Sequence, residues 1–194
     1  MKKSNLLPAI IAVAMCFGLT AGATGVPVYT NIGTPIANSD AKVLVASGGD
    51  VTVTYLVAGN PGYEDILYYN GTVIFDNKTS TQGSTYDLGN IAAGTVMNFT
   101  LQVVETGRTY AMGSGANNSD GTVHAYVVDG WPSTGTAYVG FEDLANGISD
   151  YNYADMNFTF TSVTAAAVPE PSTFALLGLA GIAGLIARRR KQKA

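Results

Sequence analysis

Apolar side chains in the central part of the chain alternate with polar ones, which is the period of a β-strand rather than of a helix. Residues 51–57 and 156–161 are the clearest examples, because every second position in them is valine, tyrosine, methionine or phenylalanine. Two further apolar segments flank Asn70-Gly71, the pair that best accepts the positive φ angles of a type I′ turn. These patterns predict an all-β domain that contains a hairpin.

The number and spacing of such segments indicate how the domain is built. Glycine and asparagine separate them, and no amphipathic helix is evident that would connect parallel strands. We therefore predict an antiparallel β-sandwich of about seven or eight strands. Residues 24–38 are predicted as an extended lead-in and residues 162–168 as a short tether. The predicted strands lie at residues 51–57, 66–69, 72–75, 96–104, 109–112, 123–128, 137–141 and 156–161.

The first 23 residues have the three zones of a secretory signal. Lys2-Lys3 supplies the charged start, residues 6–19 supply the apolar run, and Ala21-Gly22-Ala23 supplies the small-residue cleavage site. We predict a signal helix over residues 1–23, with cleavage after Ala23. A membrane anchor and a lipoprotein signal acylated at Cys16 are the alternatives. Cleavage removes the single cysteine, so the mature chain has no disulfide.

The other end of the chain combines a proline-rich motif, an apolar run and a basic end. Residues 168–172 read Val-Pro-Glu-Pro-Ser, residues 174–187 are apolar, and residues 188–194 are basic. Fourteen helical residues reach only about 21 Å, against about 30 Å of hydrocarbon, so the predicted transmembrane helix is short. The positive-inside rule places Arg188, Arg189 and Arg190 in the cytoplasm and residues 24–167, the predicted folded domain, outside it.

This order of features resembles the PEP-CTERM sorting signal, which covers residues 168–194. The resemblance implies a Gram-negative bacterium that makes exopolysaccharide, export by the Sec translocase, and a precursor anchored in the inner membrane. It further implies that an exosortase recognises Pro169, Glu170 and Pro171 and passes the protein to the cell surface or the medium. An ordinary C-terminal membrane anchor is the alternative.

Charge is unevenly distributed along the chain. Seven of the ten basic residues lie at the two ends, whereas thirteen of the fourteen acidic residues and three basic ones lie between residues 24 and 168, a net charge of −10. Such a surface repels phosphate backbones, so we expect no nucleic-acid partner. Contact with the membrane is expected only through the tail of the precursor.

Carboxylates and amides gather between two of the predicted strands. Glu142, Asp143, Asp150, Asn152 and Asp155 fall within fourteen residues, and acids that close repel one another unless a cation lies between them. Calcium prefers oxygen ligands of this kind, whereas zinc prefers histidine or cysteine. We predict a calcium site formed by these five residues. A solvated acidic loop that protects the edge of a sheet is the alternative.

Residues 140–155 also resemble the end of an acidic domain of unknown function that is common in PEP-CTERM precursors. The resemblance implies calcium binding through Glu142, Asp143, Asp150 and Asp155. This sequence departs from the pattern at Asn152, where aspartate is usual, and at Ala154, where asparagine is usual.

The remaining candidates favour a binding or structural role over catalysis. His124 is the only histidine, and no nucleophile elbow, phosphate loop or zinc-ligand spacing accompanies it, so we expect no catalytic residue and no enzyme. Trp131 is a candidate glycan contact, because aromatic rings pack against the apolar faces of sugars. We expect a matrix component associated with exopolysaccharide or biofilm. A carbohydrate-binding module or an adhesin of the cell envelope is the alternative.

Overall fold

The computed structural model describes residues 25–59 and 62–168. The predicted signal helix (1–23), the transmembrane segment (174–187) and the basic end lie outside these residues. No helix within the described part of the chain is both long and apolar enough to cross a membrane. The described residues form two short 3-10 helices, η1 (Asn38–Asp40) and η2 (Gly115–Asn117), and twelve strands. These are β1 (Lys42–Ala46), β2 (Gly49–Ala58), β3 (Asp65–Tyr69), β4 (Thr72–Asp76), β5 (Thr85–Ile91), β6 (Val96–Met97), β7 (Phe99–Val103), β8 (Arg108–Ala111), β9 (Ala125–Asp129), β10 (Thr136–Phe141), β11 (Met156–Thr161) and β12 (Val163–Ala167).

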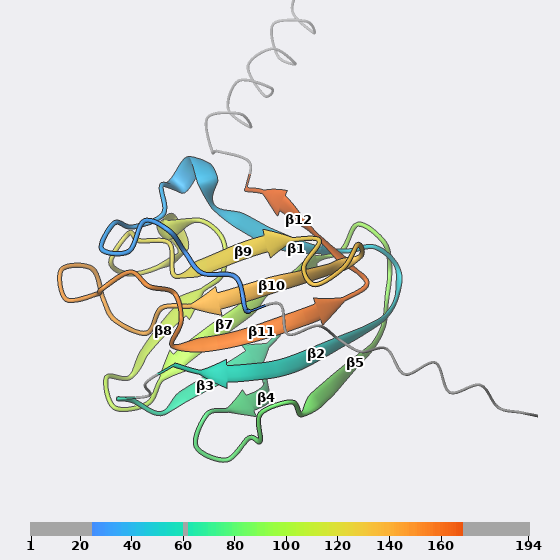
Figure 1. Ribbon diagram of the computed structural model, residues 1–194, viewed down its shortest axis with the longest axis horizontal. Coiled ribbons are helices and arrows are strands. Elements are labelled where there is room, and N and C mark those ends of the chain that lie inside the picture. The colour runs from blue at the N-terminus through green and yellow to red at the C-terminus, as the bar shows by residue number, and fades with distance from the viewer. Residues whose placement is uncertain (1–24, 60–61, 169–194) are drawn as a thin grey trace, which may run out of the picture.

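The strands form three sheets in which every pair is antiparallel. A five-stranded sheet has the order β5-β2-β11-β10-β9, a four-stranded sheet has the order β4-β3-β7-β8, and a small third sheet has the order β12-β1-β6. Figure 1 shows the five-stranded sheet in front of β3, β7 and β8, with β1 and β12 along one side. The prediction of an all-β, antiparallel domain is confirmed.

One apolar core joins the two larger sheets. Phe158 on β11 stacks on Phe75 of β4 with ring centroids 5.7 Å apart, and Phe160 meets Phe99 of β7 at 4.8 Å. Both β11 rings are fully buried, as the alternating pattern requires. Such aromatic pairs bury much apolar area and have preferred geometries, so they also fix how the sheets face each other.

The predicted number of strands is wrong, because the described residues form twelve. The predicted tether at 162–168 is mostly β12, which pairs with β1 from Lys42↔Ala167 to Ala46↔Val163. Its sequence, Val-Thr-Ala-Ala-Ala, has weak strand propensity and lacks the alternation of apolar and polar residues that marks a half-buried strand. β12 is a strand because it pairs with β1. An aspartate and a glycine interrupt the apolar pattern of β5, which is therefore absent from the predicted strands. The predicted strand at 96–104 is divided at Asn98 into β6 and β7.

The predicted hairpin is confirmed. Asn70 and Gly71 have φ angles of 47° and 82°, and they connect β3 to β4. Positive φ at both central residues is the mark of a type I′ turn, whose twist matches that of the flanking strands.

The predicted lead-in packs over the outer face of the five-stranded sheet. Tyr29 packs edge-on against Tyr126 of β9 and against Tyr153, with centroids 5.3 and 4.9 Å apart. The Ile36 backbone N–H donates to the Tyr153 hydroxyl at 3.0 Å, and the Gly33 N–H donates to the Asp150 carbonyl at 2.7 Å. These contacts bring the N-terminal segment beside the acidic loop between β10 and β11.

Candidate cation site

The acidic loop, residues 142–155, folds back tightly over the ends of two strands. Gly140 on β10 lies so close to the carbonyl oxygen of Tyr153 that a Cβ atom there would overlap it. A Cβ atom on Gly59 would lie 2.5 Å from the carbonyl oxygen of Ala154, and the Gly59 N–H donates to the Asp155 carbonyl. Glycine at these two positions therefore allows the close approach that brings the loop onto the sheet.

Hydrogen bonds within the loop hold its rim in one conformation. The Asn152 side chain accepts from the Ala154 N–H at 2.6 Å and donates to the Asp150 carboxylate at 2.7 Å. Tyr151 and Tyr153 have φ angles of 50° and 53°, a left-handed conformation that is uncommon for residues other than glycine. Backbone of this kind persists where surrounding contacts enforce it, and it is frequent at functional sites.

Three of the five predicted ligands come together. Glu142, Asp143 and Asp155 each place a carboxylate oxygen within 4.8 Å of the others. The Asp143 N–H donates to Asp155 Oδ2 at 3.0 Å, which holds the two residues side by side. Asp150 and Asn152 lie at the rim instead. There they line an open cavity of about 220 Å³ together with Asp143 and Asp155.

Glu142 is buried without enough partners for its charge. Its side chain is 0% exposed, Oε2 accepts a long hydrogen bond of 3.4 Å from the Tyr153 N–H, and the Ser149 side chain is a further hydrogen-bond partner of the carboxylate. Oε1 is buried and has no hydrogen-bond partner among the described residues. An ionised carboxylate in such a place is costly unless a cation or a proton compensates it.

A fourth carboxylate, Asp65, belongs to the same electrostatic group but comes from the other large sheet. It is the first residue of β3, it is 0% exposed, and within the described part of the chain its Oδ1 also has no hydrogen-bond partner. The Asn77 side chain holds it by accepting from the Asp65 N–H at 3.1 Å and donating to Oδ2 at 3.4 Å. Asp65 is not among the ligands predicted from the sequence. An aspartate directly before an apolar strand was the only signal in the sequence.

Burial and mutual repulsion disfavour the ionised form of all four acids. Burial, together with the charge of Asp155, raises the pKa of Asp65 from 3.8 to about 7. The same two causes raise the pKa of Glu142 from 4.5 to about 7. Burial raises the pKa of Asp143 and of Asp155, and the charge of Asp155 raises that of Asp143 further. Near neutral pH the ionised cluster is therefore unfavourable, and either bound protons or a bound metal ion would compensate its negative charge.

The residues present suit a hard cation. Every side-chain atom in the cluster that could ligate a metal is a carboxylate oxygen. The only histidine, His124, has both ring nitrogens in hydrogen-bond contact with other protein groups. Calcium accepts carboxylate, carbonyl and water oxygens in flexible geometry, whereas zinc prefers nitrogen and sulfur. The unpaired oxygen of Glu142, which belongs to the group of three close carboxylates, is one that a bound cation would satisfy.

His124 has a structural setting. It is 0% exposed, and its ring stacks on Tyr110 with centroids 3.6 Å apart. Nδ1 contacts the Glu142 carbonyl at 2.9 Å, and Nε2 contacts Asp120 Oδ2 at 3.0 Å. Each ring nitrogen therefore has a polar partner inside the core, and the buried ring offers no exposed atom to a substrate.

Trp131 lies in the turn between β9 and β10, away from the acidic cluster. Its ring is half-buried and packs edge-on against Tyr138, with centroids 5.6 Å apart. Tyr138 is buried and donates to Asn157 Oδ1 at 2.8 Å. The tryptophan therefore leaves only part of its surface for a ligand.

Comparison with known proteins indicates how the chain is sorted by the cell. The family model of the PEP-CTERM protein-sorting motif matches residues 167–191. The predicted sorting motif is thus confirmed, and it implies an exported, membrane-anchored precursor that is processed by an exosortase for the cell surface. No curated protein and no solved structure matches the chain.

The matched residues begin where the described fold ends. Ala167, the first of them, is the last residue of β12 and pairs with Lys42 of β1. Pro169, Glu170 and Pro171, like Arg188, Arg189 and Arg190, lie in the matched segment and outside the described residues. The folded domain therefore continues to the start of the sorting motif.

Proposed function

We propose that this protein is a calcium-stabilised structural component of an exopolysaccharide-associated surface layer or biofilm. Its tail directs an inner-membrane precursor to an exosortase, and the β-domain is the part that remains at the surface. The observation on which the proposal most depends is the group of three close carboxylates with a fourth, Asp65, in electrostatic contact, in a chain that carries a surface-sorting motif. Two oxygens of these four acids are buried without a hydrogen-bond partner among the described residues.

Calcium is the ion that best suits this setting. Extracellular calcium modules bind with dissociation constants of about 10⁻⁴–10⁻³ M, a range in which a site at the cell surface fills and a cytosolic one does not. The cluster lies between β3 of one sheet and the loop before β11 of the other. A bound ion would hold the two sheets together and do what a disulfide does in other exported domains.

The same observations support a non-enzymatic role. His124 is the only histidine, and both of its ring nitrogens contact protein groups inside the core. We propose that His124 fixes the segment directly before β9 to the acidic loop through the Glu142 carbonyl, and that the protein has no catalytic site.

A carbohydrate-binding module is the second candidate function. Aromatic side chains follow one another across the outer face of the five-stranded sheet, with successive rings in edge-on contact: Trp131, Tyr138, Tyr126 and Tyr29. Tyr138 is buried, but Trp131, Tyr126 and Tyr29 are half-buried, and their exposed ring surfaces are suited to contact the C–H faces of sugars.

Fractionation of a producing culture tests the proposed function. We expect the wild-type protein in the exopolysaccharide fraction, and we expect a variant with alanine at Pro169, Glu170 and Pro171 to stay in the inner membrane, because the exosortase no longer recognises it. Thr173→Ala, next to but outside the Val-Pro-Glu-Pro-Ser element at 168–172, is the matched control. Wild-type protein that does not sediment with the polysaccharide, or a triple variant that reaches the surface normally, would contradict the proposal.

A further inference from the structure

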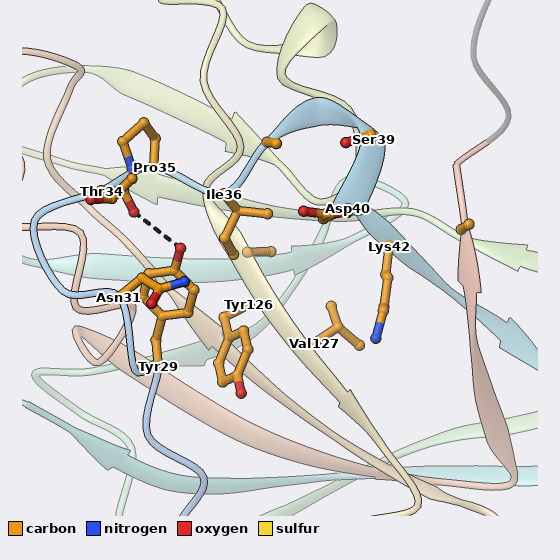
Figure 2. A pocket seen from close by; sticks show the side chains of 13 residues that line it. Tyr29, Asn31, Thr34, Pro35, Ile36, Ser39, Asp40, Lys42, Tyr126 and Val127 are labelled. Atoms are coloured by element: carbon orange, nitrogen blue, oxygen red, sulfur yellow. Dashed lines mark hydrogen bonds between the residues drawn. The ribbon is translucent and has the colours of Figure 1, made fainter.

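A sizeable cavity lies between the N-terminal segment and the free edge of the five-stranded sheet. It has a volume of about 500 Å³, and its walls come from residues 29–42, from β9 and from the last residue of β12. This size falls within the range of about 300–1,000 Å³ that is typical of small-ligand sites. In Figure 2, Tyr29 and Asn31 lie on one side of the cavity and Asp40 and Lys42 on the other.

The aromatic wall of this cavity is held in place before any ligand arrives. The Tyr29 hydroxyl donates to the Thr34 carbonyl at 3.1 Å, and the Tyr29 ring packs between Tyr126 and Tyr153. Tyr153 itself is buried and its hydroxyl donates to the Val123 carbonyl. A ligand that stacks on these rings therefore causes little loss of side-chain entropy.

Four polar side chains around the cavity have no hydrogen-bond or ion-pair partner among the described residues. Within the described part of the chain, the side chains of Asn31, Asp40 and Lys42 and the hydroxyl of Tyr126 make no hydrogen bond and no ion pair with the protein. They offer an amide, a carboxylate, an ammonium and a phenol, which together donate and accept several hydrogen bonds. Because they surround an apolar centre formed by Ile36 and Val127, the cavity suits a ligand with hydroxyls around an apolar face.

The edge of β9 adds main-chain groups to this set. Gly130 donates to the Thr136 carbonyl and Glu142 donates to the His124 carbonyl, so the even-numbered residues of β9 bond to β10. In an antiparallel pair the intervening residues, Ala125 and Val127, direct their N–H and C=O groups away from β10, toward the cavity that they line. Asp129, the next residue of β9 with this orientation, does not line the cavity, so only these two residues are available there. Two residues are too few to pair with an added strand, which argues against a peptide occupant.

We propose that this cavity binds a neutral saccharide, with the sugar rings against Tyr29 and Tyr126 and the hydroxyls on Asn31, Asp40, Lys42 and the β9 edge. The net charge of −10 between residues 24 and 168 disfavours a polyanion, and the opposite charges of Asp40 and Lys42 suit an uncharged, hydroxyl-rich ligand. The inference deepens the proposed function and rests on it, because it names the part of the domain that would hold the polysaccharide.

Saturation-transfer NMR and titration calorimetry on the full-length chain in mild detergent test this site. The probes are neutral oligosaccharides of glucose, of galactose and of N-acetylglucosamine. We expect at least one of them to bind, Tyr126→Ala to weaken it about tenfold through loss of ring stacking, and Lys42→Met to weaken it several-fold. Lys42 is exposed, so its replacement leaves the fold intact. Tyr86→Ala, a half-buried tyrosine on β5 outside the cavity, is the matched control and should bind normally.

Three results would overturn the proposal. They are the absence of binding by every probe, unchanged binding in both cavity variants, and binding that is lost in Trp131→Ala but kept in Lys42→Met. If the cavity variants still sediment with exopolysaccharide as the wild type does, the saccharide site is wrong while the proposed function stands. If the wild type fails to sediment, the proposed function itself is wrong.

Discussion

Without divalent cations, the protein should melt about 10 °C lower near pH 8 than near pH 5. Asp65 and Glu142 have pKa values of about 7 in the folded state, against 3.8 and 4.5 for the exposed side chains. The folded state therefore binds more protons than the unfolded state between about pH 4 and pH 7. The contribution of these protons to stability is complete below about pH 4 and is lost as the pH rises through about 7.

Calcium should remove most of this pH dependence. The ion occupies the position of the protons and binds only the folded cluster, so at about 100 times its dissociation constant it adds about 2.7 kcal/mol to the free energy of unfolding. For a domain of this size that corresponds to a rise of about 5–10 °C in melting temperature near pH 8. Thermal melts by circular dichroism, with and without calcium at each pH, measure both effects.

Magnesium at the same concentration is the control, since it dehydrates reluctantly and requires near-octahedral geometry. A melting temperature that is the same from pH 5 to pH 8 without calcium would show that the buried acids are compensated in another way.

Asp65→Asn and Glu142→Gln should each abolish the calcium-induced rise in melting temperature. Each substitution removes one buried charge and keeps the shape of the side chain. Each variant should therefore also melt higher than the wild type near pH 8 in the absence of calcium, because less repulsion remains in the cluster. The two opposite effects together distinguish a cation site from a merely structural pair of acids, whose loss would destabilise the protein in both conditions.

Asp87→Asn on β5 is the matched control. Asp87 is exposed and lies outside the cluster, so its replacement should leave both the calcium response and the pH dependence unchanged. If Asp65→Asn responds to calcium as fully as the wild type does, Asp65 is not part of the site.

Much of the fold follows from local pattern, and the parts that do not are set by partners far along the chain. Residues 51–57 and 156–161 could be predicted because alternation over several positions reports one buried face. β12 could not be predicted, because its Ala-rich sequence is a strand only through its pairing with β1, about 120 residues earlier.

The candidate site, like the fold, could be predicted from the sequence only where its residues lie close together in the chain. Glu142, Asp143 and Asp155 are close in sequence, so a loop was enough to suggest that they meet. Asp65 lies on another sheet, and only the packing of the two sheets brings its charge near Asp155. Asn152 has an oxygen that could serve as a metal ligand, but that oxygen accepts a hydrogen bond from the Ala154 N–H and helps to shape the loop.

The most direct test of the cation site is titration calorimetry of the full-length protein with calcium near pH 7, in two buffers of different ionisation enthalpy. We predict binding of about one ion with a dissociation constant of at most about 1 mM, and a measured heat that depends on the buffer because the ion displaces protons from the carboxylates. The absence of a binding heat at calcium concentrations up to about 5 mM would contradict the account.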